Sequence, residues 1–323
     1  MNNSMDIRFG LCCINTSLRE AKPPVFSSRT VRLATIEKNG IGYVKDLVLQ
    51  NIKDTIRIFE ENVKDDIYVF RISSEVFPHV TNKKCGGYSL DFAHEALKEL
   101  GDAAKLHKQR ITAHPGQYNV LGSPRQDVID ATVEYLNFQA EMFDIMGMGV
   151  DSVMVIHGGG LYGDKEKTKK RWVDNFKLLS KSAQQRLVLE NCEKCYSVQD
   201  CLDISTMVKE KYGFYVPVVV DSHHYECYNI LHADEEPNNM DELMPCVMET
   251  WQERGIRMKV HVSEQGEGKI GHHSDYVKLL PQYFIDVYEI YGEPFDIMVE
   301  AKAKEKAIFF LQKKYKHFCQ CCN

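Results

Sequence analysis

The chain has 323 residues, of which 44% are hydrophobic and 27% are charged, and its formal net charge is −6. This is the composition of an ordinary soluble globular chain. No run approaches the roughly 18 apolar residues that a membrane span needs, and the start, MNNSMDIRFG, lacks the pattern of a secretory signal. We therefore expect an intracellular protein, cytoplasmic or nuclear, with no membrane partner.

Eight segments have the length and the β-branched or apolar composition of β-strands. In chain order they cover residues 7–13, 67–74, 110–115, 153–159, 186–191, 218–224, 258–264 and 296–302. Helical patterns separate them, at residues 47–60, 89–105, 169–182, 198–212, 241–254 and 275–291, with a further helix after the third strand. Residues 23–38 look like an irregular excursion.

The helix after the third strand has the clearest signals. Ser123, Pro124 and Gln126 suit the N-cap, N1 and N3 positions. Apolar residues then recur every three to four positions as far as Phe143, which predicts a stripe that packs on the sheet.

Strand–helix alternation repeated eight times predicts an α/β protein, a TIM (β/α)8 barrel. An open doubly wound sheet is disfavoured because no glycine-rich phosphate loop follows the first strand. We expect a single domain over residues 1–323. Its core covers about 7–307, and residues 308–323 form a C-terminal helix and a cysteine-rich tail.

Eleven cysteines, an odd number without a signal sequence, indicate reduced thiols rather than a disulfide framework. Cys192 and Cys195 have the spacing of half a zinc site, but no second half has a convincing spacing. The tail between Cys319 and Cys322 could bind metal or be an incidental flexible end, and we favour the second reading.

The last six predicted strands end at residues that bind metals well. A barrel brings these strand ends to one face, where the active sites of such barrels lie. The candidate ligands there are His114, His157, Glu190, Asp221, His224, His261, His273 and Glu300. A lone histidine at a strand end is more often an ordinary core or surface residue, but eight such residues in succession favour a metal site. The chemistry alone leaves His223 and His272 open as alternatives to their neighbours.

Eight imidazole or carboxylate ligands exceed the need of one ion and suit two or three divalent ions. The mixture favours zinc, manganese or iron over calcium and magnesium. Glu190 and Glu300 could each bridge a pair of ions, which would then clamp the attacking and leaving oxygens of a phosphodiester. The negative net charge counts against a nucleic-acid partner at first, but three divalent ions would add six positive charges and cancel it.

Several motifs resemble the UV-damage endonuclease family, a relative of the endonuclease IV barrels. They are FRISS (70–74), HPGQYNVLGSP (114–124), VIHGGGLYGDK (155–165), LENCE (189–193), VVVDSHHY (218–225), KVHVS (259–263), HSDYV (273–277) and EAKAKEKA (300–307). The match spans roughly residues 7–307, with the motifs in the family's order. It implies a repair enzyme that nicks DNA immediately 5′ of ultraviolet photoproducts, and often of abasic sites, using up to three ions, typically manganese.

The resemblance also implies roles for single residues. It carries the ligand role over to the same eight positions and settles His273 over His272. Gln117 and Tyr118 match a probe that enters the duplex at the lesion, where an aromatic and an amide can replace lost stacking and pairing. Lys259 matches a lysine beside the metals, where it could contact phosphate, be neutral, or be carbamylated and become a ligand.

Two positions depart from the family's pattern. Leu11 stands where an aromatic residue is common, which could shift lesion preference, and Cys192 stands where an acid is usual. Neither change touches a proposed ligand, so we expect activity to survive both.

The expected function is therefore metal-dependent hydrolysis of damaged double-stranded DNA, 5′ of cyclobutane pyrimidine dimers and 6-4 photoproducts and also at abasic sites, leaving a 3′-hydroxyl and a 5′-phosphate. The expected cofactor is two or three Mn²⁺ ions, with Zn²⁺ or Mg²⁺ as alternatives. Glu190, Glu300 and Lys259 are the predicted catalytic residues, and a monomer would suit enclosure of a bent duplex. The alternatives are a metal-dependent sugar isomerase or epimerase of the same barrel class, and a non-catalytic damaged-DNA binding protein.

Overall fold

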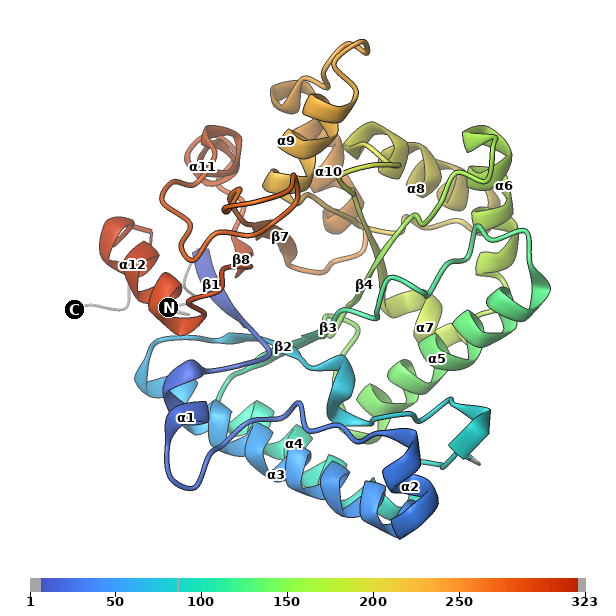
Figure 1. Cartoon of the computed structure of the whole chain (residues 1–323). Coiled ribbons are helices and arrows are strands. Elements are labelled where there is room, and N and C mark those ends of the chain that lie inside the picture. Colours follow the sequence, from blue (N-terminus) through green and yellow to red (C-terminus); the bar gives the residue numbers. More distant parts are fainter. Residues whose placement is uncertain (1–6, 86, 319–323) are drawn as a thin grey trace.

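The computed structural model describes residues 7–85 and 87–318, and within them eight parallel strands form a barrel (Figure 1). The strands are β1 (Ile7–Cys12), β2 (Val69–Ile72), β3 (Arg110–Ala113), β4 (Met154–His157), β5 (Leu187–Glu190), β6 (Val218–Val219), β7 (Met258–Val262) and β8 (Phe295–Val299). Hydrogen-bonded neighbours run from β6 through β1 to β8 and β7, and a parallel bridge between Asp221 and His261 joins β6 to β7. The chain is the predicted TIM (β/α)8 barrel.

Helices surround the strands on the outside (Figure 1). They are α1 (Thr16–Glu20), α2 (Leu33–Asn39), α3 (Ile41–Lys64), α4 (His94–Leu106), α5 (Gln126–Ile145), α6 (Lys165–Phe176), α7 (Lys181–Arg186), α8 (Val198–Tyr212), α9 (Ser222–Leu231), α10 (Met240–Gln252), α11 (Gln282–Glu289) and α12 (Glu305–Lys314). Three short 3₁₀ turns lie at Ser74–Val76, Lys83–Cys85 and Asp91–Ala93. No helix in the described ranges is both long enough and apolar enough to cross a membrane.

Each helix buries one stripe against the barrel. In α3, Val44, Val48, Ile52 and Phe59 are fully buried at helical spacing. The strands instead are buried on both faces, because side chains fill the barrel interior and helices cover its outside. Because the strands are parallel, the residues that follow them collect at one end of the barrel.

Several expected helix boundaries were wrong. The helix after β3 begins at Gln126 with Arg125 as N-cap, because the Ser123 hydroxyl accepts a hydrogen bond from the Arg125 amide in a turn before the helix. The excursion at 23–38 contains most of α2, and α9 begins directly after Asp221, where a strand was expected to continue. The last helix starts at Glu305 rather than 308, and the predicted cysteine-rich tail at 319–322 lies outside the described residues.

An ion cluster closes the opposite end of the barrel, where the strands begin. The carboxylate of Asp296 is fully buried and accepts hydrogen bonds from Arg8 at 2.7 and 2.8 Å, from Arg110 at 2.7 Å and from Arg257 at 2.8 Å. Burial would raise the pKa of Asp296, but the three guanidinium groups outweigh it and hold the pKa far below its usual range. These ion pairs should therefore contribute to stability rather than to chemistry, because the active sites of such barrels lie at the other end.

Candidate metal centre

Glu190 lies at the centre of the candidate metal site, at the end of β5. Its side chain is fully buried. One oxygen accepts a hydrogen bond from His114 Nε2 at 2.8 Å and the other from His261 Nδ1 at 2.7 Å, and His157 Nε2 lies 3.5 Å away. Burial acts to raise the pKa of Glu190, but the surrounding imidazoles outweigh burial and hold the pKa well below its usual range. The carboxylate is therefore charged at neutral pH.

Six of the eight predicted ligands have their donor atoms within 4.8 Å of one another in overlapping groups of three. The groups join residues from the ends of β3, β4, β5, β7 and β8 with Asp221, which follows β6. They contain His114, His157, Glu190, Asp221, His261 and Glu300. The barrel thus brings together side chains that lie up to 186 positions apart in the sequence.

The donor set fits divalent cations. Asp221 is fully buried, its Oδ1 accepts from the His224 amide at 2.8 Å, and its Oδ2 has no hydrogen-bond partner among the described residues. His157 Nδ1 is likewise buried without a described partner. Buried polar atoms are normally satisfied. A cation among these oxygens and nitrogens would satisfy a carboxylate oxygen that the protein itself leaves open.

The other two predicted ligands flank this cluster. His224, in the first turn of α9, has its Nδ1 3.7 Å from Glu190 and 3.1 Å from the carbonyl oxygen of Asn191. Burial lowers the pKa of His224, but nearby carboxylates, Asp221 foremost, raise it to about 9. His273 Nδ1 lies 2.9 Å from the carbonyl oxygen of Glu300.

The geometry also separates each of these histidines from its neighbour. His224 lines the cleft described below, whereas His223 is buried and contacts the thiol of Cys227. His273 lies beside the end of β8, whereas His272 is more peripheral, with its Nδ1 near the carbonyl oxygen of Glu267. The positions of His224 and His273 therefore suit a ligand role better than those of their neighbours.

Lys259 is buried directly under the cluster. Its Nζ lies 2.7 Å from His261 Nε2. Burial, aided by the positive charge of Arg71, lowers the pKa of Lys259 to about 7. Because His261 Nδ1 faces Glu190, its Nε2 is the nitrogen left to face the amine. Lys259 thus lies beside one of the predicted ligands, and its role next to metal ions stays a prediction.

Two further residues support the cluster, and the sequence analysis did not single them out. Arg71, from β2, forms an ion pair with Glu300. Asn191 is fully buried, accepts from the Asp221 amide at 2.8 Å and donates to the Asp221 carbonyl at 3.1 Å. An arginine inside an apolar strand and an asparagine directly after a proposed ligand were the available signals.

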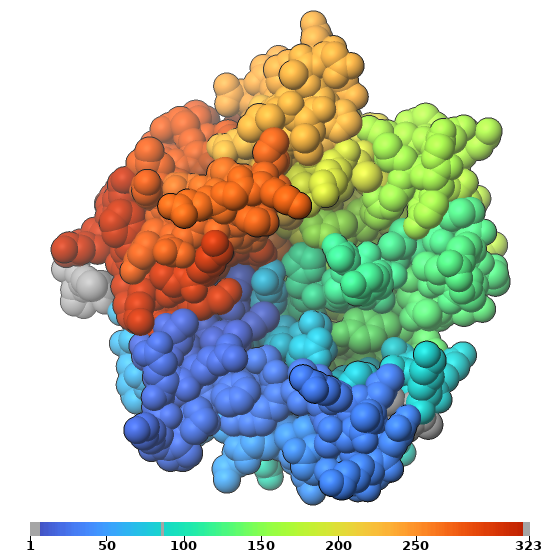
Figure 2. Space-filling model, in the orientation of Figure 1, coloured from blue at the N-terminus to red at the C-terminus, as the bar shows by residue number. Residues whose placement is uncertain are grey.

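A cleft of about 720 Å³ opens above the cluster. Its lining includes four of the predicted ligands, His114, His157, His224 and Glu300, together with residues of β2 and of the loops after β1 to β5. Figure 2 shows this face hollowed near its middle, between the orange segment that follows β7 and the teal-green segment that follows β3. An open hollow of this kind admits a large substrate.

Gln117 and Tyr118 lie at the tip of the loop after β3 and line the cleft. The tip is a turn in which the Asn119 amide donates to the Gly116 carbonyl at 3.0 Å. The Tyr118 side chain is 82% exposed, and it also borders a second hollow of about 360 Å³ beside α5. The ring is therefore accessible to a molecule that enters either hollow.

Gly159 lets the neighbouring loop pack closely against this tip. Its φ is +91°, and a Cβ at this position would lie 2.3 Å from Val120. Only glycine allows that combination of backbone angle and close approach. The loop after β4 can therefore lie against the loop after β3 at the rim of the cleft.

Comparison with known proteins gives a consistent result. The model of the family "UV-endonuclease UvdE" matches residues 7–322. A UV-damage endonuclease of Schizosaccharomyces pombe is 37% identical over 95% of this chain and 50% of its own length, and a putative UV-damage endonuclease of Acanthamoeba polyphaga mimivirus is 34% identical over 98% of this chain and 93% of its own. The chain thus spans about half of the yeast relative and nearly all of the viral one.

A solved structure has the same architecture. The crystal structure of SacUVDE superposes with a TM-score of 0.78 at 29% sequence identity, and the match covers 96% of this chain and 98% of the other. The match therefore extends over nearly the whole of both chains.

Proposed function

The chain belongs to the UV-endonuclease UvdE family, and on that premise we propose that it is a metal-dependent endonuclease that nicks ultraviolet-damaged DNA. The single observation that carries the metal-dependent part is the buried imidazole–carboxylate cluster at the floor of an open cleft. We propose incision immediately 5′ of cyclobutane pyrimidine dimers and 6-4 photoproducts, with abasic sites as further substrates. The products would be a 3′-hydroxyl and a 5′-phosphate.

We propose that the eight predicted ligands hold two or three divalent ions, Mn²⁺ in preference to Zn²⁺ or Mg²⁺. Glu190 and Glu300 would each contact more than one ion, because each carboxylate lies close to several other donors. Bound ions of this kind supply Lewis acidity at a phosphate and activate water near neutral pH.

The chain's own groups would position the substrate. Tyr118 and Gln117 would enter the duplex at the lesion, where damaged bases are already unstacked and cost less to displace. Lys259, with its pKa near 7, would in its neutral form accept a hydrogen bond from His261 Nε2, and so leave the Nδ1 that faces Glu190 unprotonated and free to bind an ion. Arg71 would hold Glu300 in its position through their ion pair.

The decisive experiment uses a labelled duplex with one cyclobutane pyrimidine dimer, incubated with the full chain and either manganese or a chelator. We expect one nick directly 5′ of the dimer with manganese only. Extension of the product by a DNA polymerase would identify the 3′-hydroxyl. The matched control is the same duplex without the dimer. Glu190→Gln tests the cluster, because it keeps the shape of the side chain and removes its charge.

Failure on dimer, 6-4 and abasic duplexes alike would overturn the proposed activity. Binding to the damaged duplex without any nick would indicate a damaged-DNA binding protein, and turnover of a free ketose would indicate a sugar isomerase or epimerase. We propose that the protein works as a monomer in a compartment that contains DNA. Light scattering during size exclusion tests the first part of that statement.

A further inference from the structure

A pair of cysteines lies in the wall of the cleft, in the loop between β5 and α8. Both Cys192 and Cys195 line the cleft. Cys192 is buried, whereas Cys195 is partly exposed. Both are free thiols. The C-x-x-C spacing is that of dithiols that form disulfides by local closure.

The loop holds the two thiols in a closed turn. The Cys192 amide donates to the Tyr196 carbonyl at 2.9 Å, and the amides of Cys195 and Tyr196 each donate to Cys192 Sγ at 3.3 Å. Short spacing and a fixed turn lower the conformational cost of joining the sulfurs. The two cysteines are thus held at the first and fourth positions of one closed turn.

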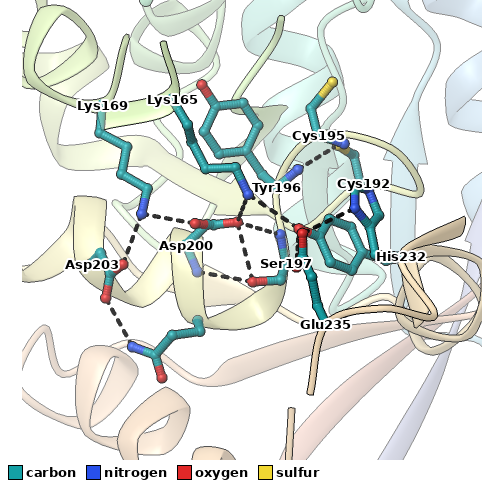
Figure 3. A network of polar contacts seen from close by, with 12 residues as sticks. Lys165, Lys169, Cys192, Cys195, Tyr196, Ser197, Asp200, Asp203, His232 and Glu235 are labelled. Atoms are coloured by element: carbon teal, nitrogen blue, oxygen red, sulfur yellow. Dashed lines mark hydrogen bonds and ion pairs between the residues drawn. The ribbon is translucent and has the colours of Figure 1, made fainter. Parts of the chain in front are cut away.

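Contacts on both sides anchor this turn (Figure 3). On the α8 side, Ser197 and Asp200 form a capping box, and Lys165 binds Asp200 at 2.9 Å. At the tip, His232 Nε2 donates to the Lys194 carbonyl at 2.9 Å. Because the turn is anchored in this way, a disulfide formed within it should shift the backbone at the ends of the loop.

The other end of the loop leads directly to the proposed metal site. Asn191 adjoins Cys192, its amide side chain pairs with the backbone of Asp221, and its carbonyl oxygen faces His224 Nδ1 at 3.1 Å. A shift of Cys192 would move Asn191 and, through it, two of the proposed ligands. The thiol pair is in this way mechanically connected to the site.

We propose that Cys192 and Cys195 form a modification site that peroxides oxidise to an intramolecular disulfide, and that this disulfide reduces DNA nicking. The effect on nicking rests on the proposed function, whereas the formation of the disulfide does not. Disulfides that form reversibly in reducing compartments commonly serve as redox sensors.

Cys195 would react first because it is the more accessible thiol. The neighbouring Cys192 side chain is the main cause that lowers the pKa of Cys195, to about 6, with a further contribution from Lys165. The Cys195 thiolate attacks one peroxide oxygen, the O–O bond breaks and water leaves after protonation, which forms a sulfenic acid. The Cys192 sulfur then attacks the Cys195 sulfur, the S–O bond breaks and a second water leaves. Two thiols lose two electrons in total, and one hydrogen peroxide gains them.

The test is peptide mapping of the full chain after hydrogen peroxide treatment and blocking of remaining thiols. Trypsin cuts after Lys194, between the two cysteines, so the disulfide joins peptide 187–194 to peptide 195–209. We expect this joined species in the native protein and in Cys246→Ser, an exposed cysteine on α10 that serves as matched control. We expect its loss in Cys195→Ser. Fragmentation must assign the bond to Cys195 rather than to Cys201, which the second peptide also contains.

The second measurement compares nicking by each protein before and after oxidation, with peroxide removed by catalase and manganese then added. We expect a roughly tenfold loss in the native protein, the size of effect seen when groups that orient metal ligands are disturbed, and recovery with dithiothreitol. The ratio of oxidised to reduced activity should stay near one in Cys195→Ser.

The outcomes are separable. A bond to another cysteine, or sulfinic acid without a joined peptide, overturns the modification site. A joined peptide with unchanged nicking overturns the regulatory effect. A joined peptide in a protein that nicks nothing even when reduced overturns the proposed function and leaves the disulfide standing.

Discussion

Truncation of Tyr118 to alanine tests the proposed probe. The side chain is 82% exposed, so its removal should change the free energy of unfolding by no more than about 0.5 kcal/mol. A base–aromatic stack in a complex is worth roughly 1–3 kcal/mol, which corresponds to about a 5- to 150-fold change in kcat/KM. We therefore expect Tyr118→Ala to keep its thermal midpoint and to lose activity on a dimer-containing duplex within that range.

The assay is multiple-turnover nicking of a fluorescent duplex with one dimer, together with thermal unfolding. Tyr291→Ala is the matched control, because that tyrosine is 48% exposed and lies just before β8, at the end of the barrel away from the cleft. A fluorescent adenine analogue opposite the lesion reports unstacking, which should diminish in Tyr118→Ala. The reasoning is refuted if Tyr118→Ala nicks as fast as the native chain, or if both tyrosine variants lose activity equally.

Three other predictions concern the cluster and the opposite end of the barrel. Asp296→Asn should lower the free energy of unfolding by roughly 3–5 kcal/mol, because it leaves the buried Arg110 without its counter-ion. Urea unfolding measures this loss, and an unchanged urea midpoint would contradict the prediction. Folding depresses the pKa of Asp296, so the stability that its charge contributes is present above its ordinary pKa of 3.8 and is lost as the pH falls below that value. The difference in free energy of unfolding between the native protein and Asp296→Asn should therefore narrow in acid. Glu190→Gln should bind less manganese per chain, measured by elemental analysis after dialysis, and should nick more than roughly 100-fold more slowly; full metal content would argue against Glu190 as a ligand. Lys259→Met should raise the thermal midpoint of the metal-free protein at pH 7. Burial lowers the pKa of Lys259 from 10.5 to about 7, so between these values the unfolded chain binds a proton that the folded chain does not, and the lysine destabilises the folded state. The gain in thermal midpoint should shrink toward pH 10, and a gain independent of pH would refute this reasoning.

The sequence predicted the barrel and the place of the cluster for a physical reason. Each of the eight predicted strand segments overlaps an observed strand, although β6 covers only the first two residues of its segment, because strands buried on both faces leave continuous apolar runs. Parallel strands then bring their carboxyl ends to one face, so His114 and Glu300 meet although 186 positions separate them. Their role as metal ligands stays a prediction.

Hydrophobic periodicity in the sequence does not predict the hydrogen bonds of single side chains. Ser123 had the composition of an N-cap, yet its hydroxyl serves a turn two residues before the helix. The choice between His223 and His224 depends on the first turn of α9, which Asp221 caps, and that turn was read as strand. Arg71 looked like an ordinary strand residue because its partner, Glu300, is distant in sequence.

Charge placement would reconcile an acidic chain with the proposed DNA substrate. At the end of the barrel where the strands begin, three arginines and Asp296 compensate one another at short range, so they add little field at the cleft. At the floor of the cleft, three divalent ions would add six positive charges beside Glu190, Glu300 and Asp221, so the metal-loaded site would be far more positive than the metal-free one. The net charge of −6 would become zero for the whole chain at the same time. Affinity for a phosphodiester should therefore depend on the metals rather than on a basic surface, and removal of the ions should abolish binding of damaged DNA as well as its cleavage.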